Sequence, residues 1–370
     1  MIAGMGLRLA TFNLENLYSR FDFLGRVART RRLVGGYAIE DRRDYELARM
    51  AFEAVASDDM RQATALAIAA TRADILCVQE VDSAEALDVF YEAYLKPVLR
   101  QAFAIATKGM DAAARDALSP MFFYDHRHVG EGNDSRGIDV GVMARAPFRA
   151  VSNAALTYDF VADAPLDWAA LEAQGAARTQ RLFKRDCLMV ETEHDGAPLT
   201  LFVCHFKSMQ PASAGGDGRA DTQAVRAAEV WAVRRLIERR FGQDVARANW
   251  AICGDFNDFL VAEGVAARHS ALAPLFIDGF CVNVVERLAP QERWTHYYTG
   301  GDAYVQLDYI CLSPALAAAN PDALPEIERR GQPMRVPRLA DAPRFPRIGW
   351  DRPKASDHCP VTLELALPRP

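Results

Sequence analysis

The chain has no long apolar run and no sign of an export leader. No apolar stretch in its 370 residues approaches the ~20 residues needed to cross a bilayer, and Met1 to Gly6 contain no basic group ahead of an apolar segment. Internal repeats and low-complexity tracts are also missing. We therefore expect a protein without a transmembrane segment, with export by an unrecognised route left open.

Cysteine is scarce and odd in number. Five of the seven cysteines, Cys77, Cys204, Cys253, Cys311 and Cys359, lie within or against apolar segments. Buried free thiols behave as small hydrophobic side chains. The pattern therefore argues against a disulfide framework and predicts a cytoplasmic location.

Positive charge is in deficit. The formal net charge of −6 argues against a strong, indiscriminate grip on nucleic acid, but it does not exclude a nuclease. Arginine gathers in two stretches, Arg20 to Arg49 and Arg329 to Lys354. Each stretch is either a solvated loop or a rim that contacts phosphate, and the sequence leaves both interpretations open.

No linker divides the chain. Half of the residues are hydrophobic, which is enough for one deep core. We expect one catalytic domain over residues 7–367, with a helical insertion at about 18–72 and a Pro- and Arg-rich excursion at about 320–353. The helix-forming part of the insertion, Asp44 to Ala70, is expected to cap the cleft.

Polar side chains lie at the ends of short apolar runs. The runs read as buried strands and are Leu7 to Phe12, Ile75 to Val78, Trp250 to Cys253, and Tyr309 to Leu312. The polar residues beside them are Asn13, Glu15, Glu80, Asp255, Asn257 and Asp308, and Asp357-His358 precedes a further strand. If the strands form one or two packed sheets, these ends converge on one pocket. Clustered carboxylates repel one another, and oxygen ligands favour Mg²⁺, or alternatively Mn²⁺, over Zn²⁺.

The order of these motifs resembles the endonuclease/exonuclease/phosphatase superfamily. The motifs are Asn-x-Glu at 13–15, Gln-Glu at 79–80, Gly-Asp-x-Asn at 254–257 and Ser-Asp-His-x-Pro at 356–360. The His-Phe-Lys-Ser run at 205–208 is most similar to the bacterial nuclease branch. The resemblance implies an α/β (α+β) fold, a four-layer αββα sandwich of two packed mixed sheets flanked by helices.

The resemblance also implies a metal site. Glu80 resembles the principal metal-binding glutamate of the family. Asn13, Glu15 and Asp357 would complete or support the site. The implied cofactor is Mg²⁺, with Mn²⁺ as the alternative.

The catalytic roles follow from the same resemblance. Asp255 matches the aspartate that orients or deprotonates the attacking water, and Asn257 would hold a phosphate oxygen. His358 resembles the histidine that contacts the phosphate, and Asp308 the carboxylate that fixes that imidazole. His205 matches a second histidine, which assists the leaving oxygen or binds the phosphate.

Further basic residues are candidates for contact with substrate phosphate. They are Arg136 and Lys207, although Gly137 beside Arg136 is equally well explained as a bulge in the chain. The remaining histidines are expected at the surface or in loops, namely His126, His128, His194, His269 and His296.

The sequence thus predicts a metal-dependent phosphodiester hydrolase, a nuclease that cleaves DNA or RNA by direct attack of water. The alternative is a phosphoesterase acting on a nucleotide, an inositol phosphate or a phospholipid head group. A binding module that has lost catalysis is a third interpretation. The sequence does not decide between DNA and RNA, between endo and exo cleavage, or the oligomeric state.

Overall fold

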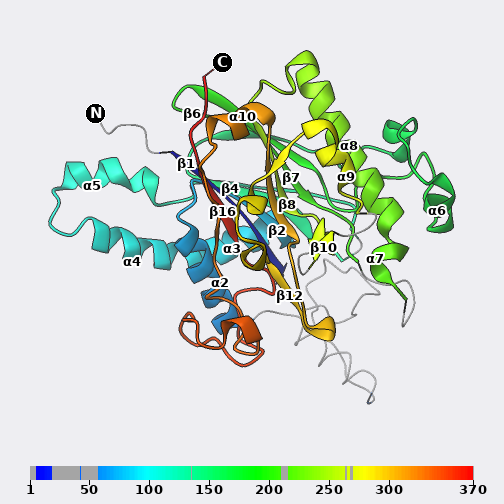
Figure 1. Ribbon diagram of the computed structural model, residues 1–370. Helices are drawn as coiled ribbons and strands as arrows, with labels where there is room; N and C mark the ends of the chain where they lie inside the picture. Colours follow the sequence, from blue (N-terminus) through cyan, green and yellow to red (C-terminus); the bar gives the residue numbers. More distant parts are fainter. Residues whose placement is uncertain are drawn as a thin grey trace.

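Two six-stranded mixed sheets pack face to face in the computed structural model, which describes residues 6–18, 42, 57–134, 136–209, 216–262, 265–266 and 270–369. Helices cover both outer faces, α2 to α4 on one side and α8 and α9 on the other (Figure 1). The fold is therefore the four-layer αββα sandwich expected from the sequence.

The strands divide between two large sheets and one small one. The first sheet has the order β15 (Glu326–Ile327), β16 (Val361–Leu365), β1 (Leu7–Leu17), β2 (Ile75–Val81), β4 (Asp139–Ala144), β3 (His126–Gly130). The second has the order β11 (Val282–Asn283), β14 (Asp308–Leu312), β8 (Trp250–Asp255), β7 (Ala197–His205), β6 (Leu188–His194), β5 (Phe148–Val151). A small sheet joins β10 (Val265–Ala266), β9 (Val261–Ala262), β13 (Ala303–Val305) and β12 (His296–Tyr298). The pairs β1 with β2 and β7 with β8 are parallel, whereas β1 with β16, β2 with β4, β6 with β7 and β8 with β14 are antiparallel.

The helices are mostly short. They are α2 (Asp58–Thr71), α3 (Ala84–Phe90), α4 (Lys96–Ala106), α5 (Ala112–Leu118), α6 (Trp168–Ala173), α7 (Gly218–Asp221), α8 (Gln223–Phe241), α9 (Ala273–Phe276) and α10 (Pro314–Ala319). A π-helical turn at Tyr91–Leu95 links α3 to α4. Short 3₁₀ turns lie at Ser119–Met121, Tyr158–Val161, Gly242–Asp244, Ile277–Gly279, Val284–Arg287, Pro290–Glu292, Thr299–Gly301 and Pro337–Leu339. Among the described residues, none of the helices has the length and apolar character of a membrane span.

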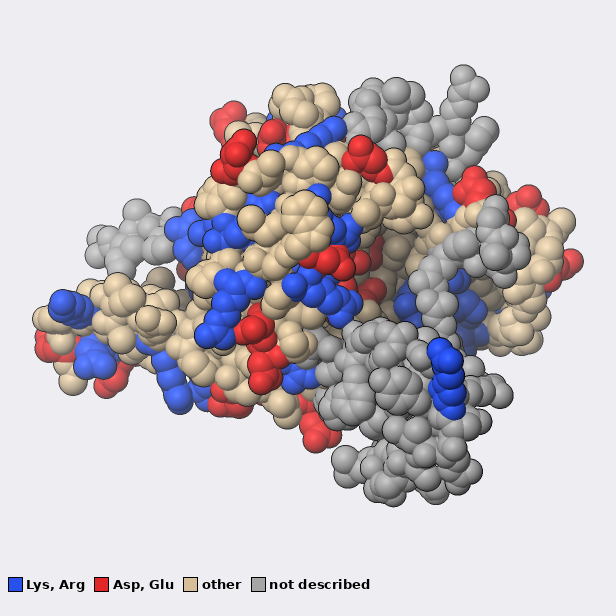
Figure 2. All heavy atoms as spheres, turned by 90° about the horizontal axis from the view of Figure 1, so that it is seen from below, with Lys and Arg blue, Asp and Glu red and all other residues tan. Residues whose placement is uncertain are grey.

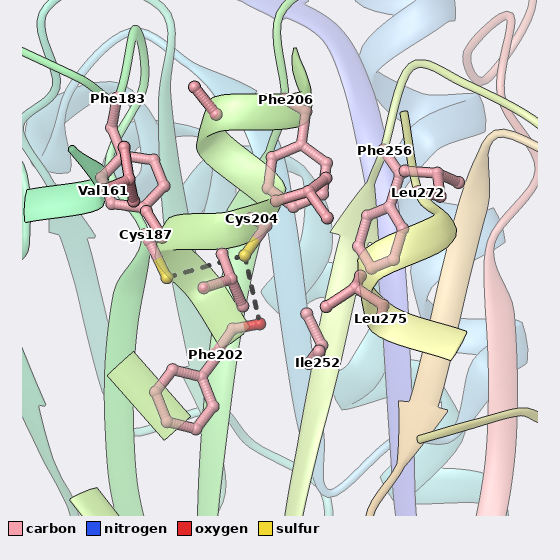
Figure 3. Close-up of a cluster of buried hydrophobic side chains, with 14 of the residues drawn as sticks. Val161, Phe183, Cys187, Phe202, Cys204, Phe206, Ile252, Phe256, Leu272 and Leu275 are labelled. Atoms are coloured by element: carbon pink, nitrogen blue, oxygen red, sulfur yellow. Dashed lines mark hydrogen bonds between the residues drawn. The ribbon is translucent and has the colours of Figure 1, made fainter. Parts of the chain in front are cut away.

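Alternation along each strand divides the core into layers. In β7, Leu201 and Val203 face the other sheet, whereas Phe202 and Cys204 face the helices. Figure 3 shows the helix side, where Cys204 packs among phenylalanines and lies with its Sγ 3.7 Å from the Sγ of Cys187. All seven cysteines are free and buried.

The structure describes part of the first predicted insertion and all of the second. Most of the segment at 18–72 lies outside the described residues, including residues 44–56 of the stretch Asp44 to Ala70. Its described helix, α2, packs Ala67 and Ile68 against the outer face of the first sheet, so that α2 is an outer-layer helix. The excursion at 320–353 covers a small apolar cluster with Trp294 and Val336.

Candidate active site

The inward-facing row of side chains changes from apolar to polar at one end of the strands. In β1 the row runs from Leu7 and Leu9 to Thr11 and Asn13, and in β8 it ends at Asp255. The register places Asp255 opposite both His205 of β7 and Asp308 of β14. Asn13 is paired with Gln79 in the first sheet. Both sheets therefore deliver polar groups to the same end of the sandwich.

Asp255 is the centre of this group. Its carboxylate accepts the backbone N–H of Asn257 at 2.8 Å, and the side-chain amides of Asn257 and Asn13 at 3.0 Å each. Burial raises the pKa of Asp255 to about 7, partly opposed by the charge of His358. A carboxylate poised near neutrality is suited to accept a proton from water.

His358 and Asp308 form a tight pair. Nδ1 of His358 lies 2.8 Å from Oδ2 of Asp308, and Nε2 points toward Oδ2 of Asp255 at 3.8 Å. Burial alone would lower the pKa of His358, but the carboxylates of Asp308 and Asp255 outweigh it and hold that pKa well above its usual value. Thr295 Oγ1 accepts the backbone N–H of Asp308 at 3.0 Å. The pair therefore presents an imidazolium N–H toward Asp255.

His205 and Glu80 lie beside Asp255. Nε2 of His205 is 3.4 Å from Oδ2 of Asp255 and 3.8 Å from Oε1 of Glu80. Burial, assisted by Arg185 and Arg136, lowers the pKa of His205 well below its usual value, so that it is neutral. The pocket therefore combines one charged and one neutral imidazole.

Four residues in or beside this site have left-handed backbone. Glu15, Asn16, Glu80 and Asn257 have φ values of 50°, 59°, 62° and 49°. The backbone N–H of Asn16 donates to the carboxylate of Glu80 at 3.0 Å. Left-handed backbone at non-glycine residues is costly and clusters at functional sites, where the surrounding structure holds it in place.

Glu15 has basic neighbours. Its Oε1 lies 2.8 Å from Nζ of Lys354 and 3.6 Å from a guanidinium nitrogen of Arg352. Burial, with a contribution from Asp357, raises the pKa of Glu15 to about 7. Its Oε2 is buried and has no hydrogen-bond partner among the described residues.

These oxygen donors fit a hard divalent cation. The Glu80 carboxylate stands at the strained end of β2, and the orphaned Oε2 of Glu15 is a second buried oxygen in need of a partner. Asn13 donates its amide N–H to Asp255 and accepts the backbone N–H of Glu15 at 3.0 Å. Carboxylate and amide oxygens are the donors that Mg²⁺ and Mn²⁺ prefer.

Asn257 is more fully engaged than the sequence indicated. Its Nδ2 donates to Asp255 and, at 3.1 Å, to the carbonyl of Phe206. In this arrangement the amide orients Asp255, whereas the resemblance implied a contact with a phosphate oxygen.

The predicted phosphate contacts lie in a basic corner. Nε of Arg136 is 3.3 Å from Asp134, and burial together with Arg185 lowers the pKa of Lys207. Arg185 was missed by sequence reasoning. It is buried, pairs with Asp134 at 2.9 Å and donates to the carbonyl of Phe206. A single arginine before a strand gives no sequence signal that it will be buried beside the site.

The expectation for His296 was wrong. Its ring packs against that of His358 with the centroids 4.8 Å apart, and the two residues form a β-bridge. The sequence feature that could have indicated this placement is the polar position of His296 in the Trp-Thr-His-Tyr run upstream of Asp308. His128 is exposed as expected, and His269 lies outside the described residues.

The second arginine-rich stretch is largely occupied by internal contacts. Arg329 pairs with Glu292, Arg330 with Glu328 and Arg347 with Asp59. Apart from Arg42, Arg20 to Arg49 lies outside the described residues. On the face shown in Figure 2, Lys and Arg side chains form separate patches interspersed with Asp and Glu.

Comparison with known proteins identifies the family of the chain. A family model described as the Endonuclease/Exonuclease/phosphatase family matches residues 10–358. No curated protein matches the chain.

Solved structures share the fold at low sequence identity. A beta toxin from Staphylococcus aureus is 11% identical with a TM-score of 0.52, over 97% of this chain and 100% of that one. An endonuclease/exonuclease/phosphatase from Beutenbergia cavernae is 15% identical with a TM-score of 0.50, over 98% and 72%. Because the family model matches nearly the whole length of this chain, the chain belongs to the Endonuclease/Exonuclease/phosphatase family.

Proposed function

We propose that the protein is a divalent-metal-dependent phosphodiester hydrolase that cleaves DNA or RNA. The observation that carries the proposal is the buried Asp255 carboxylate, held by two asparagines and faced by the imidazoles of His205 and His358. This arrangement places a proton acceptor beside a charged donor, with Nε2 of His358 3.8 Å from Oδ2 of Asp255.

Glu80 is the proposed principal metal ligand, and Asn13, Glu15 and Asp357 complete or support the site. A bound Mg²⁺ or Mn²⁺ would polarise a phosphoryl oxygen. The ion pair of Glu15 with Lys354 and the hydrogen bond of Asn13 to Asp255 favour a supporting role for these two residues.

The side chains of the pocket divide the proton chemistry. Asp255 takes the proton of the attacking water, and Asn257 holds Asp255 in the required orientation. His358, kept protonated by Asp308, donates Nε2–H to the phosphate as charge develops. His205 assists the leaving oxygen, and Arg136 and Lys207 contact further phosphate oxygens.

The proposed substrate class is argued from the distribution of charge around the site. The basic corner at Arg136 and Lys207 supports local contact with a phosphodiester, whereas the mixed charge on the face in Figure 2 supports no broad polyanion surface. The alternative substrate is a small phosphoester, that is, a nucleotide, an inositol phosphate or a phospholipid head group. Seven free thiols are stable in a reducing compartment, and the cytoplasm is the proposed location.

The test is a hydrolysis screen of the metal-stripped protein with and without added Mg²⁺ or Mn²⁺. DNA, RNA, nucleotides, inositol phosphates and sphingomyelin are compared at several salt concentrations. We expect metal-dependent cleavage of a nucleic acid that weakens as salt rises. Undiminished turnover without metal would contradict the mechanism. Preference for a small phosphoester at every salt concentration would replace the nuclease assignment by the alternative.

A further inference from the structure

One group of potential ligands in the pocket is not explained by an oxygen-ligated cation. His296, Asp357 and His358 each bring one ligand atom within 4.8 Å of the other two. Two of the three are imidazoles, which suit Zn²⁺ and other late transition metals, whereas Mg²⁺ prefers oxygen. The site therefore contains two donor sets of different chemical preference, which share Asp357.

His358 is oriented as metal-binding histidines are. Its Nδ1 pairs with Asp308 at 2.8 Å, so that Nε2 points into the pocket, 4.0 Å from Oδ1 of Asp357. A carboxylate behind the distal ring nitrogen fixes the tautomer and orientation of zinc-ligating histidines in the same way.

His296 supplies an independent observation. Its Nδ1 is buried and has no hydrogen-bond partner among the described residues, although its ring packs directly on His358. A buried ring nitrogen without a partner costs free energy unless something binds it. A metal ion bound through Nδ1 would supply the missing partner.

The three ligand atoms lie farther apart than those of a tetrahedral centre, and side-chain movement would bring them to that spacing. With metal–ligand bonds of roughly 2.0–2.1 Å, neighbouring ligand atoms lie about 3.3 Å apart. The Asp357 to His358 separation is 4.0 Å, so a small closure of these side chains would suffice. Three protein ligands would leave a position for water, or for Oδ2 of Asp255, which is 3.8 Å from Nε2 of His358.

We propose that His296, Asp357 and His358 form a transition-metal site that binds Zn²⁺ and, when filled, inhibits hydrolysis. An imidazole that binds a metal through Nε2 carries no proton there, so His358 could not donate to the phosphate. The inhibitory part rests on the proposed function, whereas the binding part does not.

The binding test uses the full chain in saturating Mg²⁺, so that Glu80 and the other oxygen ligands that the two sites do not share are occupied. Zn²⁺ binding is measured by calorimetry and by competition with a chromogenic chelator. We expect one Zn²⁺ per chain, bound at least about tenfold more weakly by His296→Phe, as losses in and around metal sites generally show. His128→Phe removes an exposed histidine of β3 and is the matched control, with unchanged affinity expected.

A second readout does not depend on turnover. Co²⁺ added in place of Zn²⁺ should give the visible absorption of a four- or five-coordinate centre with imidazole ligands, and His296→Phe should lose it. Circular dichroism and thermal melting of both variants check that they are folded. If wild type binds no Zn²⁺ in Mg²⁺, or if a folded His296→Phe binds it as tightly, the site does not exist.

The inhibition test follows hydrolysis in Mg²⁺ as Zn²⁺ is added. Each rate is normalised to that protein's own rate in Mg²⁺ alone, and His296→Phe should require about tenfold more Zn²⁺ for half-inhibition. Equal inhibition of both proteins, despite a loss of binding in the variant, would overturn the inhibitory role. His296-dependent binding in a protein that hydrolyses nothing would support the site and count against the proposed function.

Discussion

At the residue scale, the hydrogen bonds to Asp255 make it the most informative position to change. Asp255→Asn keeps the shape of the side chain and removes the proton acceptor, so we expect kcat to fall by roughly 10²–10⁴-fold. The free energy of unfolding should hardly change, because burial already disfavours the charged form. Steady-state kinetics and thermal melts measure the two effects. A variant that unfolds would show that Asp255 is structural.

The Asp308–His358 pair predicts a pH-dependent stability in the metal-free protein. The pKa of His358 in the folded chain lies well above the value of about 6.5 expected when the chain is unfolded. The stabilisation is therefore fully present below about pH 6.5 and is lost as pH rises through the folded pKa. Urea unfolding of wild type and His358→Gln should differ more at pH 6 than at pH 9. An equal difference at both pH values would mean that the histidine is not charged in the fold.

Sequence reasoning identified the residues of the pocket whose position follows from a motif at a strand end. Asp255, Asp308 and His358 are examples, and the structure brings them together. It missed Arg185 and His296, because their roles depend on what packs against them and on no local pattern.

At the element scale, the parallel pair β7 and β8 carries His205 and Asp255 to the same level. Gly254 makes this pairing possible, since its φ is 150° and an added Cβ would lie 1.8 Å from the carbonyl oxygen of Cys204. Gly254→Ala would force the strands apart and should lower the free energy of unfolding by about 3 kcal/mol. Denaturant unfolding measures the loss.

Gly196→Ala is the control for that substitution. Gly196 also has a positive φ, of 79°, but nothing lies within 4 Å of an added Cβ. Its cost should be about 1 kcal/mol, from backbone strain alone. Equal costs at the two positions would show that the approach of β7 to β8 is not the limiting contact.

Whole elements were also predictable where a local sequence pattern defines them, and not where their place depends on packing. Strands β1, β2, β8 and β14 were predicted because a short apolar run with a polar end is typical of a buried strand. The place of α2 in an outer layer was not, because helix-forming composition does not indicate which surface a helix covers.

At the scale of the whole molecule, the metal site should couple cation binding to folding. Carboxylates gathered from both sheets repel one another, and a cation that binds only the folded state stabilises it, by about 2.7 kcal/mol at 100 times Kd. Mg²⁺ should therefore raise the melting temperature of wild type and have a much smaller effect on Glu80→Gln. Differential scanning calorimetry with and without chelator compares them. An equal shift in both would place the cation away from Glu80.

The seven buried thiols can be used to follow how the protein unfolds. A water-soluble alkylating reagent can reach them only when the layers separate, and they are spread over both sheets, for example Cys77 in β2 and Cys311 in β14. Mass spectrometry after a short pulse of reagent would then show how the chain opens. A chain that opens all at once would jump in mass from none to seven adducts. A chain that opens layer by layer would pass through intermediate masses. Cys359 is next to His358, so the stage at which it is alkylated would show when the active site unfolds relative to the rest of the chain.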